Sequence, residues 1–367
     1  MNNINEEKNI SAEVSAEETE SAVMMRRKIK QGCSRAGAVI LWQQLLASVL
    51  LIIINTAISV KLTAEIMAEN PKITQEGLTL ALTQAISEAV DPVVLNAVLM
   101  VIANIFAIVM VFSGRKLFKL KDTLGKSKLP ISGTVLAAFG IIGIQGASIF
   151  IQSFVMSITG FSGMNEAVMS SLSFTDDLVI NIILFLYMVV LGPVLEELMF
   201  RSGVLNFLSP VSRTFGLFAS SLLFGLMHMN FNQIFNGFLL GLILGYIALK
   251  SGSVRPAIIC HMAANLNAFI ASFVFEYKLI DVLGQEKAVM GEMIMFGVEM
   301  VIGIAALVIL LRKYGKVNDN DAITGFIYNA EPSERKELTV NTLLKTPTFW
   351  VSAVLSIYVA FSLVTQL

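Results

Sequence analysis

The feature that most constrains this chain is a series of long apolar stretches that recur along almost its whole length. Hydrophobic residues make up 55% of the 367 residues and charged residues only 14%, whereas soluble proteins carry about 25% charged residues. An α-helix needs about 20 apolar residues to cross a bilayer. The sequence therefore predicts an all-α fold, a polytopic transmembrane bundle of eight or nine helices. The helices are expected at 37–60, 93–113, 130–156, 177–199, 214–229, 233–249, 256–275, 288–311 and 347–366.

The distribution of lysine and arginine predicts how these helices are oriented, because cytoplasmic loops carry an excess of both residues. Basic clusters precede the first helix and follow the second and the eighth, whereas acidic residues outnumber basic ones in 61–92 and 157–177. This alternation predicts an integral membrane protein with a cytoplasmic amino terminus and, for nine helices, an external carboxyl terminus. The net charge of −1 creates no field that would attract nucleic acid, so no nucleic-acid partner is expected.

The expected organisation divides the chain into four segments. The acidic part of 1–36 has few apolar residues to bury, so this segment is expected to be a cytoplasmic disordered tail that ends in a basic juxtamembrane stretch. N-terminal transmembrane helices follow over 37–176, and a helical core occupies 177–276. The last segment, 277–367, contains C-terminal helices and a cytoplasmic linker over 313–346.

Two of the predicted helices carry regularly spaced glycines. Residues three or four apart lie on one helix face, and small residues there let a neighbouring helix approach closely. Close packing without any chemistry is therefore expected at Gly140, Gly143 and Gly146 and at Gly237, Gly241 and Gly245.

Ionisable side chains inside the apolar helices are the strongest functional signal in the sequence. A charged group at the centre of a bilayer costs roughly 3 kcal/mol or more, so each one is by default a functional hypothesis. The chain has two histidines, His228 and His261, and both lie within predicted helices. Glu196, Glu197 and Arg201 lie together at the end of another predicted helix.

The spacing of these charged residues predicts different surroundings for them. Glu197 and Arg201 are four residues apart, so they can form an ion pair on one helix face. Glu196 is rotated by about 100° from Glu197 and is therefore expected to face a polar cavity inside the bundle. A carboxylate in such a cavity is a candidate general base.

Two further pairs are spaced by four residues, Phe224 with His228 and His261 with Asn265. The second pair offers two donors aimed at one point, as stabilisation of an oxyanion requires. With Glu196 as the base, the three helices together could activate water and stabilise a tetrahedral intermediate. This is the chemistry of peptide or ester hydrolysis.

Two other interpretations stay open from the residues alone. Glu197 and Arg201 could form a buried pair that only fixes helix packing, and His228 could be a satisfied interfacial histidine. A set of Glu196, His228 and His261 could instead hold a divalent metal ion such as zinc. The HExxH motif is absent and the two histidines lie on different helices, so the sequence leaves the metal undecided.

Serine and cysteine nucleophiles have less support. No GxSxG motif occurs in the chain. Cys33 lies in a basic stretch and Cys260 inside a helix, so neither a disulfide framework nor a cysteine zinc site is expected. Cys260 points about 100° away from His261 on the same helix, and both thiols are expected to be inert.

Three motifs of the chain resemble the signature of the CPBP family of intramembrane proteases, the CAAX protease and bacteriocin-processing or Abi family. They are EELMFR from Glu196, FGLMH from Phe224 and HMAAN from His261, and they occur in the order of the family. The resemblance covers about 177–276 and implies a glutamate-dependent endopeptidase. The implied roles are water activation for Glu196 and His228, oxyanion binding for His261 and Asn265, and support of the site for Glu197, Arg201 and Phe224.

The resemblance also implies a class of substrate. Eukaryotic members of the family remove the last three residues of prenylated CAAX proteins, and bacterial members are linked to peptide maturation and bacteriocin immunity. A bacterial cell membrane and a membrane-associated peptide or protein substrate are therefore favoured. Two rival functions use the same cavity: a non-catalytic bacteriocin-immunity or scaffold protein, and a proton-coupled transporter with Glu196 and His228 as its relay. The lack of an internal repeat argues against the transporter.

The depth of the site imposes a geometric condition. Glu196, His228 and His261 must lie at one depth in the membrane to act together. This condition requires either that the helix with Glu196 continues past Leu205, or that the helix starting near Thr214 begins outside the membrane or tilts strongly.

Overall fold

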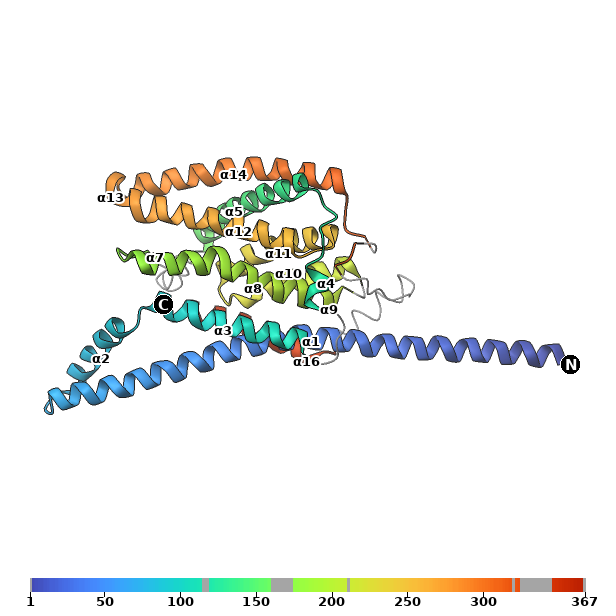
Figure 1. Cartoon of the computed structure of the whole chain (residues 1–367), viewed down its shortest axis with the longest axis horizontal. Coiled ribbons are helices and arrows are strands. Elements are labelled where there is room, and N and C mark those ends of the chain that lie inside the picture. The colour runs from blue at the N-terminus through green and yellow to red at the C-terminus, as the bar shows by residue number, and fades with distance from the viewer. Residues whose placement is uncertain are drawn as a thin grey trace.

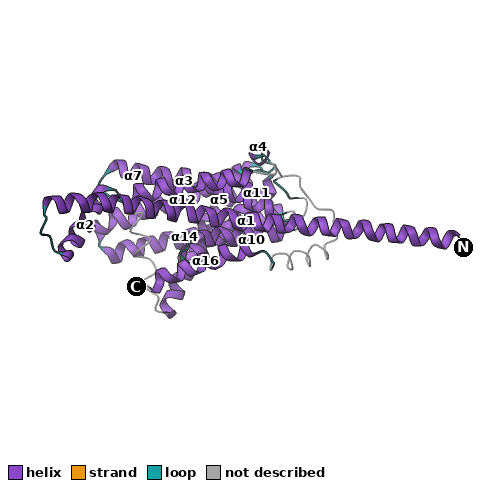
Figure 2. Cartoon of the chain, turned by 90° about the horizontal axis from the view of Figure 1, so that it is seen from below, coloured by secondary structure: helices purple, strands orange, loops and turns teal. Residues whose placement is uncertain are grey.

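The computed structural model describes residues 2–113, 119–159, 174–209, 212–318, 321–323 and 345–365, and every regular element within them is helical. This confirms the predicted all-α fold. Figures 1 and 2 show the helices running side by side along one common direction. The two shorter apolar helices are Arg213–Met227 and Pro347–Ala360. Among the described residues, seven helices are long and apolar enough to cross a membrane: Ile29–Glu69, Pro92–Phe112, Ile131–Val155, Leu178–Leu208, Phe231–Ser251, Arg255–Leu283 and Gln285–Tyr314.

Helix α1 is much longer than its apolar part. It extends over Asn2–Glu69, whereas its candidate membrane span is Ile29–Glu69. Disorder is predicted over 1–36, but the structure continues α1 through the acidic segment, which contains many of the strong helix formers alanine and glutamate. Figure 1 shows this N-terminal part of α1 projecting beyond the rest of the bundle.

Helices α1, α3 (Pro92–Phe112) and α16 (Pro347–Thr365) form one side of the bundle, with both α3 and α16 packed against α1. Helix α2 (Gln75–Ala89) connects α1 to α3. The approach of α16 to α1 is close, because a Cβ atom at Gly37 would lie 2.7 Å from the Cα of Phe349. The C-terminal helix is therefore an integral part of this side of the bundle.

Helices α5 (Ile131–Thr159) and α14 (Gln285–Tyr314) pack against each other on the opposite side. A Cβ atom at Gly143 would lie 2.5 Å from the Cα of Gly303, so the backbones of the two helices are in contact. This confirms the close packing predicted from the glycines of α5. Most of the linker predicted over 313–346, after α14, lies outside the described residues.

Gly143→Ala is expected to lower the unfolding temperature, because its methyl group meets the backbone of α14 and forces the two helices apart. Overpacking of this kind costs about 1–3 kcal/mol. Gly297→Ala is the matched control, since its Cβ atom would lie 3.7 Å from the Cζ of Phe150 in ordinary contact. Thermal unfolding in detergent should separate the two variants, and equal unfolding temperatures would contradict the backbone contact.

The site is built on a long helix that is interrupted twice. This helix continues past Leu205, which is one of the two arrangements that would let Glu196 lie at the same depth as His228 and His261. Two π-helical stretches, in which backbone hydrogen bonds join residues five positions apart instead of four, separate three α-helical parts. The parts are α7 (Leu178–Phe185), η2 (Leu186–Leu191), α8 (Gly192–Met199), η3 (Phe200–Val204) and α9 (Leu205–Leu208), of which η2 and η3 are π-helical.

A tight turn between α10 and α11 places His228 at the end of a helix. Helix α10 (Arg213–Met227) ends there, and Met229 adopts a φ of 51°. The side chain of Asn230 then accepts hydrogen bonds from the first backbone N–H groups of α11 (Phe231–Ser251). The remaining elements are α4 (Leu120–Thr123), α12 (Arg255–Ala271), η4 (Ser272–Leu279) and α13 (Ile280–Leu283).

Candidate active site

The predicted ion pair between Glu197 and Arg201 is present. The Nε of Arg201 donates to the Oε2 of Glu197 at 2.9 Å, and both side chains are 0% exposed. Glu197 lies in α8 and Arg201 in η3, so the pair spans the start of a π-helical stretch. Its complete burial means that neither charge is compensated by water.

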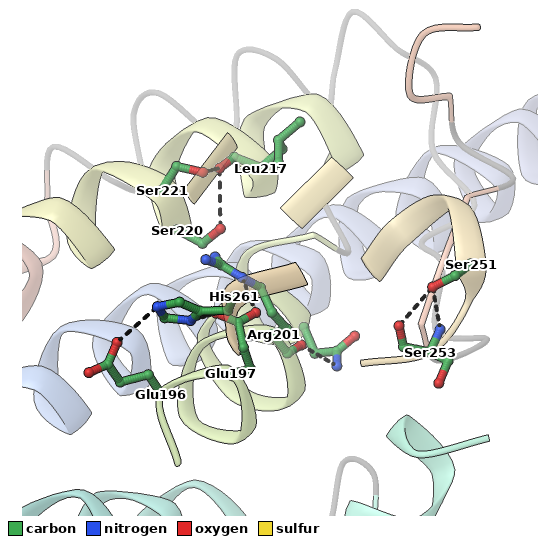
Figure 3. A network of polar contacts seen from close by, with 10 residues as sticks. Glu196, Glu197, Arg201, Leu217, Ser220, Ser221, Ser251, Ser253 and His261 are labelled. Carbon is green, nitrogen blue, oxygen red and sulfur yellow. Dashed lines mark hydrogen bonds and ion pairs between the residues drawn. The ribbon is translucent and has the colours of Figure 1, made fainter. Parts of the chain in front are cut away.

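Glu197 also contacts a helix that lies far away in the sequence. Its Oε1 atom accepts a hydrogen bond from the Nδ1 of His261 at 3.1 Å, and Figure 3 shows Glu197 between Arg201 and His261. Because a carboxylate only accepts, this contact places a proton on Nδ1. The other ring nitrogen, Nε2, lies 3.9 Å from the Oε2 of Glu196. Glu197 thus fixes the orientation of His261 relative to Glu196.

Phe224 is the apolar centre of the site. The Cζ of Arg201 lies 4.9 Å from the centroid of its ring, a cation–π distance. The rings of His228 and His261 lie edge-on to the same ring at 5.3 Å and 5.8 Å. The Nη1 and Nη2 atoms of Arg201 have no hydrogen-bond partner among the described residues, so the face of Phe224 is their main stabilising contact.

His228 is held by its own helix. Its Nδ1 lies 2.9 Å from the carbonyl oxygen of Phe224. A carbonyl only accepts, so this contact places the proton on Nδ1 and leaves Nε2 as an acceptor. A Cβ atom at Gly237 would lie 3.0 Å from the Cα of Gly225, so the glycine lets α10 and α11 approach closely beside His228.

One cavity joins most of the predicted residues. Its volume is about 250 Å³, close to the lower limit of roughly 300 Å³ for small-molecule sites. Glu197 and Arg201 are not part of its wall and lie behind it, where they contact His261 and Phe224. The predicted residues that line the cavity are Glu196, Phe224, His228, His261 and Asn265.

Four polar residues of the wall are missing from the sequence prediction. They are uncharged, and the prediction weighed mainly charged groups within the helices. A single polar residue inside an apolar helix, such as Gln145 in the span of α5, is the signal that would have found them. The four are Gln145, Tyr187, Gln233 and Asn236.

Asn265 makes a contact that its predicted oxyanion role does not require. Its Nδ2 donates to the carbonyl oxygen of Met188 at 2.8 Å. The backbone N–H of Gly192 donates to the carbonyl oxygen of Tyr187 in the π-helical stretch, and Pro193, the next residue, has no N–H to offer Met188. The proline therefore frees a carbonyl oxygen, which Asn265 satisfies with one of its two N–H bonds.

A double-mutant cycle is expected to show this coupling. Asn265→Ala should lower the free energy of unfolding by about 1–3 kcal/mol, because it leaves the Met188 carbonyl oxygen unpaired. In a Pro193→Ala background the same change should be less costly, since the new N–H can reach that oxygen. Denaturant unfolding of the four proteins measures both steps, and strictly additive losses would contradict this assignment.

Glu196, His228 and His261, the candidates for a metal site, are not arranged as a ligand set. No group of three or more His, Cys, Asp or Glu residues in the described part of the chain is placed to hold a metal ion. The Nδ1 atoms of His228 and His261 are engaged by Phe224 and Glu197, so only the Nε2 atom of each ring is open to another group. The thiol of Cys260 is buried and donates to the carbonyl oxygen of Thr134.

Comparison with known proteins finds a family model that matches this part of the chain. Residues 178–267 match the family described as Rce1-like, the type II CAAX prenyl endopeptidases. The matched segment extends from the start of α7 into α12 and contains every predicted site residue, so the resemblance to CAAX proteases is confirmed there. No curated protein matches the chain. No solved structure matches it either. The family and the seven apolar helices indicate an integral membrane protease with a peptide or protein substrate.

Proposed function

We propose that this chain, whose residues 178–267 match the type II CAAX prenyl endopeptidases, is a glutamate-dependent intramembrane endopeptidase with Glu196 as its general base. One observation carries the proposal. Of two adjacent glutamates, Glu197 is fully buried and engaged by Arg201 and His261, whereas Glu196 lines the same cavity as His228. The Nε2 of His261 lies 3.9 Å from the Oε2 of Glu196, beyond hydrogen-bond distance, so the Glu196 carboxylate is available to accept a proton.

The first step is water attack. A water molecule held by Glu196 and the Nε2 of His228 transfers one proton to the Glu196 carboxylate, and its oxygen bonds to the carbonyl carbon of the substrate. The carbonyl oxygen becomes an oxyanion, which the second N–H of Asn265 and the Nε2 of His261 stabilise. Since Nδ1 of His261 donates to Glu197, donation from Nε2 requires that the ring carries both protons.

The second step breaks the peptide bond. The tetrahedral intermediate collapses, the carbon–nitrogen bond breaks, and Glu196 returns its proton to the leaving amine. Glu197 and Arg201 act as positioning residues, because Glu197 orients His261 and the guanidinium of Arg201 packs on Phe224. No step is assigned to a metal, since the carboxylate and the two imidazoles do not form a ligand set.

The substrate is a membrane-associated peptide or protein. The cavity is large enough for a short stretch of extended peptide and too small for a folded domain. The family name points to prenylated chains that end in a CAAX sequence. The basic clusters of the sequence favour a cytoplasmic amino terminus. A bacterial cell membrane is part of the same proposal.

The proposal is tested with purified protein in lipid vesicles and a farnesylated peptide that ends in cysteine, two aliphatic residues and a final residue. Release of the terminal tripeptide, detected by mass spectrometry, is the expected result. Release that persists in His228→Ala at the wild-type rate would contradict the proposed site. Proton-driven uptake without cleavage would instead favour the transporter.

A further inference from the structure

Two amide side chains in the wall of the cavity have no role in the proposed mechanism. Gln145 comes from α5 and Asn236 from α11, and both line the cavity that contains Glu196. The Oε1 of Gln145 and the Oδ1 of Asn236 are buried and have no hydrogen-bond partner among the described residues. Gln145 is only 9% exposed, so its amide is not a surface group.

Helix α5 carries two glutamine amides in different surroundings, and Gln145 is the one that lines the cavity. Gln152, two turns further along α5, donates from Nε2 to the Oγ of Ser148 at 2.7 Å and does not line the cavity. A buried amide oxygen without a donor destabilises a protein, because it has lost its hydrogen bonds to water. A polar group of this kind in a functional cavity is explained most simply if a bound ligand supplies the missing donor.

The chemistry of the two side chains selects the class of ligand. A peptide inside a membrane has backbone N–H and C=O groups that need partners, because lipid offers none. A carboxamide presents an acceptor oxygen and two N–H donors, which match the N–H and C=O groups of a peptide backbone. A prenyl chain has no polar group for these amides to bind. The ligand that fits both amides is therefore an extended peptide.

We propose that Gln145 and Asn236 bind the peptide backbone of the substrate, each oxygen accepting a hydrogen bond from one backbone N–H. The two amides come from different helices, so together they hold the peptide extended across the cavity that Glu196 lines. They bind the backbone of the peptide and not its side chains, so they position the peptide without selecting its sequence. This inference rests on the peptide substrate of the proposed function.

The test is an ester scan of the farnesylated CAAX peptide, in which each backbone N–H in turn is replaced by an ester oxygen. Binding is measured as Kd to the full chain in nanodiscs, in the Glu196→Gln background so that no turnover occurs. Esters at two positions are expected to weaken binding by about five- to tenfold each, the size of one neutral hydrogen bond. Gln145→Met should abolish the sensitivity at one position and Asn236→Leu at the other.

A matched control and a stability measurement complete the experiment. Gln152→Met makes the same substitution on the same helix, outside the cavity, and is expected to leave the ester profile unchanged. Gln145→Met should keep or raise the unfolding temperature, because it removes an unpaired buried oxygen. An ester penalty that is the same in wild-type Gln145 and Gln145→Met would overturn the inference, whether or not the peptide is cleaved.

The outcomes separate this inference from the proposed function. Suppose that the peptide binds with the expected ester profile but is never cleaved by protein with Glu196 intact. This result would contradict the protease function and support the backbone-binding site. Cleavage of a peptide whose binding is not weakened by any backbone ester would support the protease and overturn the backbone site of Gln145 and Asn236. A peptide that neither binds nor is cleaved would overturn both.

Discussion

Glu196→Gln is expected to lower kcat for a membrane-anchored peptide by about 10³-fold, within the range that positioned acid–base groups contribute. The amide has nearly the same size but cannot take a proton from water. Glu196 lines the cavity and its side chain is 16% exposed, so the change should leave peptide affinity and unfolding temperature close to those of the unmodified chain. Initial rates and Kd measured on the same preparation give both quantities.

The control for this variant is Glu292→Gln. Glu292 is a half-buried carboxylate on α14 that does not line the cavity, so its replacement should leave kcat unchanged. Equal rates for Glu196→Gln and the unmodified protein would remove Glu196 from the mechanism. A similar loss of rate in both variants would show that any intramembrane carboxylate matters, and not the one in the cavity.

Arg201→Met is expected to lower the free energy of unfolding by about 3–5 kcal/mol, because it leaves the carboxylate of Glu197 buried without its charged partner. Both side chains are 0% exposed, so water cannot replace the lost contact. The double variant Glu197→Gln/Arg201→Met removes both charges and should recover most of the stability. Its activity should stay low, because His261 has lost the carboxylate that orients it.

Denaturant unfolding of the single and double variants in detergent measures this coupling. Lys61 and Glu65 offer the matched control, since they form an ion pair at the same spacing with side chains that are 75% and 55% exposed. Lys61→Met should change stability by about 0.5 kcal/mol or less. A loss in the double variant equal to the sum of the two single losses would contradict a buried pair.

Helical periodicity predicted the local part of the site and could not predict the long-range part. Glu197 and Arg201 are four residues apart, and the prediction that they pair while Glu196 faces a cavity followed from the geometry of one helix. The contact of Glu197 with His261 joins residues 64 positions apart and depends on how two helices pack. The rarity of histidine within the apolar helices placed His228 and His261 in one predicted site, and the resemblance to a family supported that grouping.

Other features depend on departures from regular helix geometry. The prediction assumed a uniform α-helix, whereas η2 and η3 are π-helical on either side of the short α8. The predicted difference in direction between the side chains of Glu196 and Glu197 holds, because both residues lie within the regular α-helix α8. The bond from Asn265 to Met188 arises from the missing N–H of Pro193 together with tertiary packing, which spacing alone does not reveal. The division of the chain into four segments stays a prediction.

The central claim is that Glu196 activates water and does not itself attack the substrate, and a single turnover in ¹⁸O-labelled water tests it most directly. With enzyme in excess over the peptide, the account predicts that the new carboxylate of the product carries one ¹⁸O atom after the first turnover, because its oxygen comes from the attacking water. A first-turnover product without ¹⁸O, with the label found in Glu196 instead, would show a covalent acyl intermediate on the glutamate and contradict the account.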